Sequence, residues 1–383
     1  MLPCSLERLN ELTVNVMGNS ASAHRRGRQA EEVENECREA IGRLFNVPPT
    51  HVIFTSGGTE SNNLAIWGAL GGLTQAFHWL KNNGQGKILT STVEHAATGK
   101  VVEALECMGA PVGWIGVDKE GLLDLNQLEQ ELTTRTKLLS IHHAQNEMGA
   151  LQDLRAISKL VRSKQPDALI HADAVQSFMK IPLDMEDLGV DLVSVSGHKF
   201  GGPKGIGALV LGRRFETRNP KIGNLIHGSA QQHGLRPGTV PVPAIGAFVA
   251  AAEWGQRNLG ECQRQLLTLR ERLTSQLPSL AVVNGPSDLS PNNPRRAPQT
   301  INFSLPGLPS AVAVEALSAR GYCVSSGAAC HSTNPKPNET IMQMGLGRER
   351  ALSAIRASFS AQNTTAEVDE FVKVLNEVIA QYA

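Results

Sequence analysis

The sequence predicts an α/β protein with a large domain on a covered parallel sheet and a smaller α+β domain. Between His51 and Gly212, strand candidates alternate with helix candidates, which is the order of a parallel sheet with both faces covered. The later part of the chain reads as strand, strand, helix, loop and helix, which indicates a separate α+β unit. A length of 383 residues fits two domains that share an interface.

The first elements follow from hydrophobic spacing. After a helical start, residues 25–45 place apolar side chains three and four positions apart, which predicts a helix with one buried face. The positions expected on that face are Ala30, Val33, Cys37, Ile41 and Leu44. Residues 51–56 then read as a short buried strand, and residues 56–70 turn at glycines and restart with helical spacing.

The same alternation continues downstream. Strand candidates lie at residues 87–92, 136–143, 168–174, 191–197 and 205–212. Helix candidates lie at residues 94–109 and 154–165, and one long helix is expected near residues 242–277. Residues 284–299 are rich in Pro, Asn and Ser, so we expect a surface connection there.

The charge balance and the cysteine content exclude several classes of function. Lys plus Arg and Asp plus Glu number 36 each, so the overall charge gives no reason to expect nucleic acid, an anionic membrane or a polyanionic substrate. The six cysteines include no CxxC pair, which argues against a disulfide framework or a zinc knuckle. The first residues have neither a secretory-signal pattern nor a long apolar run. We expect a cytoplasmic protein that acts on a small molecule or a protein.

The sharpest local feature is SVSGHKFGGPKG, in which a strand ends at Gly197, His198 and Lys199. A lysine held at a strand end becomes an amine nucleophile when desolvation or cationic neighbours lower its pKa, and a Schiff base with a carbonyl cofactor is the usual result. For this segment alone, a solvated loop lysine is an equal alternative.

A second strand end, HADAVQS, carries Asp173 and Gln176 and would face the same sheet edge as Lys199 if the two strands are adjacent. A buried carboxylate there could keep a pyridine nitrogen protonated; taken singly, however, Asp173 favours a helix cap or turn. Gly57, Gly58 and Thr59 precede a helix and could hold a phosphate at its positive end. If the segment is taken alone, an ordinary N-cap by Thr59 is the first interpretation.

Other candidates lie at the starts of helices and on later loops. His95 opens a helix, where its ring could lie over an aromatic cofactor or simply cap the helix. The run of His142, His143 and Glu147 suggests a metal site, but adjacent strand residues point to opposite faces, so we expect no intrinsic metal.

Cys330 lies in SSGAACHS, a run of small residues that predicts an exposed loop. Its thiol would be reactive if His331, Lys336 or a cofactor supplied positive potential; otherwise it is a free surface cysteine without function. Arg356 lies on a predicted strand after a helix, where its guanidinium would suit an amino-acid carboxylate, with a surface ion pair as the alternative.

Together these segments resemble the cysteine desulfurases of the class V aminotransferase-like group, with selenocysteine lyases as near relatives. The resemblance runs from about Gly18 to the C-terminus. In order, the matching motifs are GNSASAHRRGR, FTSGGTESNN, EHAA, QNEMG, HADAVQS, SGHKFGGPKGIGAL, GLRPGT, SSGAAC and RASFSAQNT.

The resemblance implies a fold-type I transferase dependent on pyridoxal 5'-phosphate (PLP), with a large domain on a mainly parallel seven-stranded sheet and a smaller α+β C-terminal domain. It implies a large PLP-binding domain over residues 16–245 and a small domain over residues 1–15 and 246–383, the latter carrying Cys330 and Arg356. It also implies a homodimer.

Residue by residue, the resemblance implies that Lys199 forms the Schiff base with PLP, that Cys330 attacks the substrate sulfur and that His95 stacks on the ring and moves protons. The other positions it assigns are Asp173 to the pyridine nitrogen, Gln176 to the ring hydroxyl, Asn146 to cofactor and substrate, Gly58, Thr59, Ser196 and His198 to the phosphate, Thr239 to the phosphate of the neighbouring subunit, and Arg356 to the substrate carboxylate.

The implied reaction removes sulfur from L-cysteine, giving L-alanine and a Cys330 persulfide that passes to an acceptor protein for iron–sulfur cluster assembly or tRNA thiolation. The alternatives are a selenocysteine lyase, a PLP lyase or aminotransferase of the same fold that does not need the thiol, and an inactive regulatory partner. The sequence departs from the family in lacking about ten residues of an N-terminal strand, in Gln145, in GSAQQ at residues 228–232, and in Ser360 and Ala361.

Overall fold

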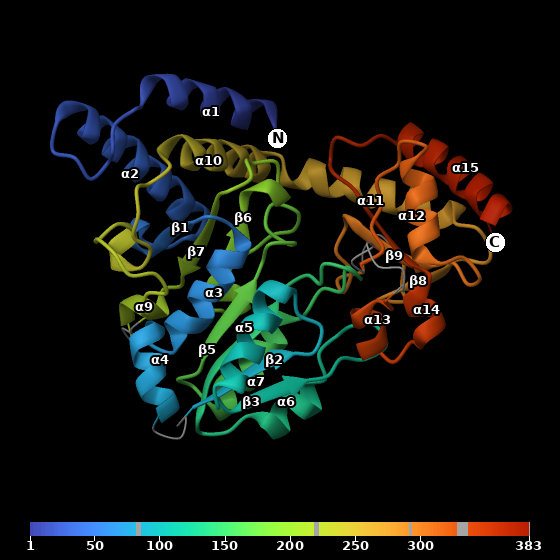
Figure 1. The fold of residues 1–383 in the computed structure, drawn as a ribbon, viewed down its shortest axis with the longest axis horizontal. Coiled ribbons are helices and arrows are strands. Elements are labelled where there is room, and N and C mark those ends of the chain that lie inside the picture. Colours follow the sequence, from blue (N-terminus) through green and yellow to red (C-terminus); the bar gives the residue numbers. More distant parts are fainter. Residues whose placement is uncertain (82–85, 218–221, 291–292, 328–335, 383) are drawn as a thin grey trace.

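Seven strands form the large sheet of the computed structural model, which describes residues 1–81, 86–217, 222–290, 293–327 and 336–382 (Figure 1). The strands are β1 Val52–Thr55, β2 Lys87–Ser91, β3 Val112–Ile115, β4 Thr136–His142, β5 Leu169–Asp173, β6 Leu192–Ser196 and β7 Gly207–Leu211. Their order is β1-β7-β6-β5-β4-β2-β3, and β7 alone runs antiparallel to its neighbours. The predicted mainly parallel seven-stranded sheet is confirmed.

Helices cover both faces of this sheet, and successive strand residues alternate between two cores. Ile53, Ile88 and Leu138 pack into the core that includes α3 and α5, whereas their neighbours Leu89 and Leu139 pack into the core that includes α2, α7 and α10. The helices of this part are α1 Pro3–Asn15, α2 Arg25–Phe45, α3 Gly58–Ala69, α4 Gly72–Lys81, α5 Ala96–Cys107, α6 Leu125–Glu131, α7 Leu154–Lys164, α8 Met185–Leu188, α9 Arg214–Thr217 and α10 Val242–Arg257.

The predicted helix over residues 25–45 is confirmed as α2. It begins after His24, whose Nδ1 accepts from the Gly27 N–H at 3.1 Å, and it ends at Asn46 in the left-handed conformation, with φ 53°. Among the predicted positions, Ala30, Cys37 and Ile41 are buried. The three- and four-residue spacing therefore identified the face that packs on the sheet.

A smaller antiparallel sheet with strand order β10-β9-β8 forms the second core (Figure 1). Its strands are β8 Val282–Asn284, β9 Thr300–Ser304 and β10 Ala354–Ser358. The surrounding helices are α11 Leu259–Gln276, α12 Ser310–Ser318, α13 Glu339–Gln343, α14 Arg348–Leu352 and α15 Thr365–Tyr382. Arg356 lies on β10, directly after α14, as predicted.

Two expectations about local structure need correction, and one strand was missed. The long helix near residues 242–277 is two helices, α10 and α11, because Asn258 leaves the helical conformation and its Nδ2 donates to the Trp254 carbonyl at 2.7 Å. The connection over residues 284–299 is not wholly at the surface, since Arg296 is buried and donates to the carbonyls of Asn284 and Pro286. Strand β3 was not predicted.

The predicted boundary at residues 245 and 246 stays a prediction. Helix α1 lies along α10 (Figure 1), and Ser5 Oγ donates to the Ala247 carbonyl at 2.8 Å. Leu12 and Phe248 both belong to the core of the large sheet, so the buried faces of these two helices pack with the large domain. Within the described residues, no helix is both long and apolar enough to span a bilayer.

Candidate active site

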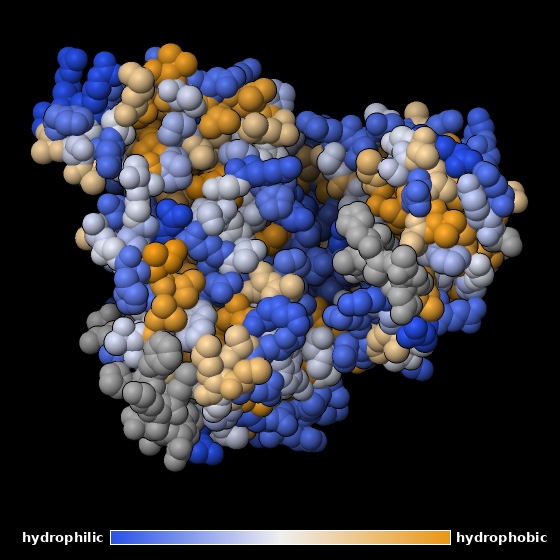
Figure 2. Space-filling view, in the orientation of Figure 1, coloured by the Kyte–Doolittle hydropathy of each residue, from blue (hydrophilic) through white to orange (hydrophobic). Residues whose placement is uncertain are grey.

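A cavity of about 530 Å³ opens where β5 and β6 end, and residues from both sheets line it. The predicted site residues that line it are Gly58, Thr59, His95, Asn146, Asp173, Gln176, Ser196, His198, Lys199 and Arg356. Thr239 is exposed and does not line this cavity, and Cys330 lies outside the described residues. In Figure 2 this face of the molecule is hollowed, with hydrophilic residues inside, between the parts built on the two sheets.

Lys199 ends a 3₁₀ turn, Gly197–Lys199, that follows directly on the buried strand β6. Withdrawal of its ammonium from water lowers the pKa of Lys199, and the positive charge of Arg356 lowers it further, while Asp173 and Glu147 oppose the shift. A lysine with a lowered pKa is a better amine nucleophile near neutral pH. Lys199 is an exposed residue that lines the cavity, so its role as the amine nucleophile stays a prediction.

Asp173 ends β5, next to β6, with Asp173 in register with Ser194. Its side chain is pinned: Oδ2 accepts from Asn62 Nδ2 at 2.7 Å and Oδ1 from the Val175 N–H at 3.0 Å. Burial raises the pKa of this carboxyl, and those two hydrogen bonds oppose the rise. Asn62 was not predicted, although it follows Gly58 by one helical turn on α3 and so shares its face.

The phosphate candidates surround the start of α3. Gly57 precedes the helix with a φ of 146°, and no side chain caps its first N–H groups. Thr59 is the second helical residue and not the N-cap, so the simple capping alternative is wrong. Ser196 Oγ lies 3.1 Å from His198 Nδ1 across the same space. Free N–H groups at a helix start, together with hydroxyls, are a common arrangement for binding an anion.

His95 satisfies both interpretations made from the sequence. Its Nδ1 accepts from the Ala97 N–H at 3.0 Å, so it caps α5, and its ring also lines the cavity. The capping bond fixes the direction of the ring. In the neutral imidazole the proton must then lie on Nε2.

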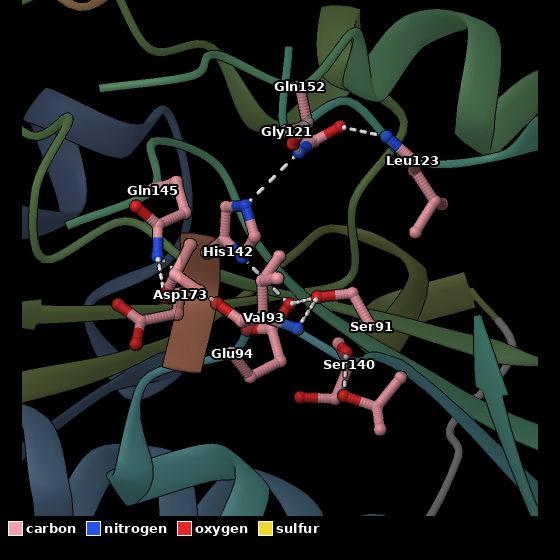
Figure 3. A network of polar contacts seen from close by, with 12 residues as sticks. Ser91, Val93, Glu94, Gly121, Leu123, Ser140, His142, Gln145, Gln152 and Asp173 are labelled. Carbon is pink, nitrogen blue, oxygen red and sulfur yellow. Dashed lines mark hydrogen bonds and ion pairs between the residues drawn. The ribbon is translucent and has the colours of Figure 1, made fainter. Parts of the chain in front are cut away.

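A buried polar network holds the turn that carries His95 (Figure 3). His142 Nδ1 and Ser91 Oγ both contact Glu94 Oε1, at 2.8 and 2.6 Å. Gln152 Oε1 accepts from the Leu123 N–H at 3.0 Å, so the Gln152 amide nitrogen, 3.1 Å from His142 Nε2, must donate to it. His142 therefore donates through Nδ1 to Glu94, the residue that precedes His95.

Arg356 is held by the turn that contains Asn146. Its Nη1 donates to the Asn146 carbonyl at 3.0 Å and to Glu147 Oε1 at 2.6 Å, and Asn146 Nδ2 donates to the same carboxylate oxygen at 3.1 Å. The pair is 24% and 12% exposed, respectively, so it lies in the cavity wall and is not a surface ion pair. The Arg356 backbone also pairs with Ser325.

The GSAQQ departure at residues 228–232 forms part of a buried contact. Gln232 Nε2 donates to Glu34 at 2.8 Å and its Oε1 accepts from Arg38 at 3.1 Å, while Glu34 and Arg38 pair at 2.6 Å. Downstream, Arg236 pairs with Glu60 on α3 at 2.9 Å. The segment that leads to Thr239 is thus anchored to the large domain.

The fold and the cavity together define an α/β enzyme scaffold with a lysine held at the strand ends of a mainly parallel sheet. A sequence model of the class-V aminotransferases matches residues 2–371. The chain belongs to the aminotransferase class-V family. The resemblance found from the motifs is confirmed.

Among the relatives, "Cysteine desulfurase IscS" of Vibrio cholerae serotype O1 is 37% identical over 364 residues, covering 94% of this chain and 85% of that protein. A solved structure titled "NIFS-LIKE PROTEIN" is 31% identical with a TM-score of 0.88, covering 100% of this chain and 96% of that one. The structure "SspA in complex with cysteine" is 28% identical with a TM-score of 0.78, covering 95% and 97%.

Proposed function

We propose that the chain is a PLP-dependent cysteine desulfurase that converts L-cysteine to L-alanine and leaves the sulfur as a persulfide on Cys330. The observation that carries the proposal is the convergence of Lys199, Asp173 and Arg356, from three distant parts of the chain, on one cavity. The relatives named cysteine desulfurase and the neighbour solved with cysteine support it.

The residues around the cavity fit PLP. The uncapped start of α3, with Gly58, Thr59, Ser196 and His198, suits the phosphate, and the buried, pinned carboxylate of Asp173 suits a protonated pyridine nitrogen. Gln176 would contact the ring hydroxyl, His95 the ring face, and Lys199 would join the cofactor through its amine. When bound, PLP supplies an acceptor for the electron pair released at the substrate.

The chain's own residues supply substrate binding and the nucleophile. Arg356 binds the substrate carboxylate, and Glu147 together with the Asn146 carbonyl fixes Nη1 so that the rest of the guanidinium fork stays available. Cys330 takes the sulfur atom of cysteine, and the carbon that loses sulfur gains a proton. Cysteine plus the Cys330 thiol thus gives alanine plus the Cys330 persulfide, with no external oxidant.

We further infer a homodimer in which Thr239 contacts the phosphate bound by the neighbouring subunit. Thr239 is exposed and its segment is anchored by Gln232 and Arg236, which supports a fixed outward presentation. The persulfide would pass to an acceptor protein for iron–sulfur cluster assembly or tRNA thiolation.

The test is to incubate the protein with PLP and cysteine and to measure alanine together with the mass of the Cys330 peptide. We expect alanine and a gain of one sulfur atom in that peptide. Lys199→Ala and Cys330→Ala should abolish alanine formation, whereas Cys323→Ala, which alters an exposed cysteine seven positions upstream, should not.

Selenocysteine separates the two main activities. A desulfurase needs the Cys330 thiol for cysteine but not for selenocysteine, so Cys330→Ala should still release alanine from selenocysteine. If Cys330→Ala is unaffected with both substrates, the desulfurase proposal is wrong. Transfer of the amino group to a keto acid would instead support an aminotransferase.

A further inference from the structure

Lys180 is a buried lysine directly behind the cavity wall. It follows β5 in the same turn as Gln176, and only 9% of it is exposed. Its Nζ donates to the Gln176 carbonyl and to Gln176 Oε1, both at 3.2 Å. Among the described residues, no acidic side chain forms an ion pair with it. A buried lysine without a counter-ion destabilises a fold, so its presence at a site edge calls for a role at that site.

The contact with Lys180 decides which end of the Gln176 amide faces the cavity. A carboxamide has one accepting oxygen and one donating nitrogen, whereas a lysine amine in this contact is the donor. Since Oε1 is held by Lys180, Nε2 is the end left for the cavity that Gln176 lines. Gln299 Nε2 donates to the Gln176 carbonyl at 2.8 Å and fixes the backbone of the same residue.

Lys199 is the neighbouring charge that acts on Lys180, and it is a cation. Burial lowers the pKa of Lys180 to about 7, and the positive charge of Lys199 contributes to the same direction. Lys180 in turn helps to lower the pKa of His198, after loss of water and the charges of Lys199 and Lys204. Lys180 is therefore electrostatically coupled to the amine and the imidazole that line the cavity.

We propose that Lys180 is a positioning residue that fixes the Gln176 amide with its N–H toward the ring oxygen of the cofactor and places positive charge behind Lys199. This rests on the proposed function. An N–H donor favours the anionic form of that oxygen, and a neighbouring cation disfavours protonation of the nitrogen that Lys199 contributes. Lys180 thus sets the protonation state of the bound cofactor without touching it.

The test compares Lys180→Met, Lys180→Arg and Lys204→Met as PLP-loaded proteins. The readout is the pH midpoint of the change in the cofactor's visible absorbance. We expect K180M to raise the midpoint by about one pH unit, the usual effect of removing one nearby charge. K180R keeps a donor and is positively charged at every pH, so it should not raise the midpoint. K204M removes an exposed cation that acts on His198 but does not contact Gln176, so it should move the midpoint less than K180M does.

The thermal unfolding temperature of K180M shows whether Lys180 positions Gln176 or is needed for the stability of the fold. Because Met matches the lysine stem and removes a buried charge, K180M should unfold at or above the wild-type temperature. An unchanged midpoint in cofactor-loaded K180M overturns the inference. If K180M does not fold, K180Q replaces it: a smaller rise is expected, and no rise also overturns the inference. Absence of Lys199-dependent absorbance in the wild type would instead overturn the proposed function itself.

Discussion

Replacing Asp173 by asparagine should abolish activity while leaving the fold intact, because Asn62 can turn its amide over. In the wild-type chain Asn62 Nδ2 donates to Asp173 Oδ2 at 2.7 Å, and Asn62 Oδ1 has no partner among the described residues. A half-turn of the Asn62 amide brings Oδ1 to the new side-chain nitrogen, while the Val175 N–H keeps its acceptor. The variant therefore keeps both hydrogen bonds and loses only the charge.

Asp173→Ala is the contrasting change. It leaves Asn62 Nδ2 and the Val175 N–H without their acceptor in a buried place, and each unpaired donor costs about 1–3 kcal/mol. We expect a loss of about 2–6 kcal/mol in the free energy of unfolding by the same reasoning. Asp173→Asn should lie within about 1 kcal/mol of wild type, because one conservative polar pair replaces another.

The pH dependence gives a second readout on the cofactor-free chain. Burial raises the pKa of Asp173 above its ordinary value of 3.8, so the folded chain holds this proton to higher pH than the unfolded chain does. The stabilisation of the folded chain by this proton is fully present below pH 3.8. It is lost as the pH rises through the raised pKa of Asp173 in the folded chain. D173N removes this loss, so its unfolding temperature should fall less than that of wild type as pH rises to neutrality.

Alanine formation tests the role of the Asp173 charge, and calorimetry tests whether the Asn62 amide turns over in D173N. Under the proposed role of Asp173 as partner of the pyridine nitrogen, loss of its charge should slow alanine formation by at least about 100-fold, the scale of removing one aligned electrostatic partner. Asp187→Asn, in an exposed pair with Arg155, is the control and should be active. An active D173N would refute the role of Asp173; a D173N as unstable as D173A would refute the amide turn.

Three further predictions concern the surrounding residues. Arg356→Lys should raise the KM for cysteine about tenfold or more with a smaller change in kcat, because a point charge replaces a bidentate fork. The rate of PLP attachment should rise with pH and level off below 10.5, the ordinary pKa of lysine, since burial and Arg356 lower the pKa of Lys199; Arg356→Gln should move this rise to higher pH. Glu34→Ala strands the buried Arg38 charge and should cost about 3–5 kcal/mol in chemical unfolding, whereas Glu39→Ala, in an exposed pair, should cost under about 1 kcal/mol.

Sequence patterns predicted which side chains share one cavity, because several of them follow recognisable strand ends. The expectation that Asp173 and Lys199 lie on adjacent strands is confirmed by the pairing of β5 and β6. Lys180 could not be singled out, because burial and the lack of an acidic partner appear only when the turn after β5 is packed. Asn62 and Glu147 were missed in their supporting roles for a similar reason, since each acts on a residue far away in the sequence.

The fold was predictable where one periodicity persisted. Helix α2 keeps its spacing over 21 residues, whereas β3 has four residues with a glycine inside and gave no usable alternation. The break at Asn258 lies between two segments that both have helical spacing, and one residue that bonds to its own preceding turn decides it. The spacing of hydrophobic residues does not show this competition between a side-chain hydrogen bond and the helix, so the break could not be predicted from it.

The backbone pairing of Ser325 with Arg356 ties two tasks to one piece of chain. The Arg356 N–H donates to the Ser325 carbonyl at 2.6 Å, and the Ser325 N–H donates back at 3.1 Å. The strand that carries Arg356, the proposed carboxylate-binding residue, therefore also anchors Ser325, which lies five residues before Cys330, the proposed sulfur acceptor. Substitution of either Ser325 or Arg356 should therefore change both the KM for cysteine and kcat. A defect in only one of these two constants is not expected.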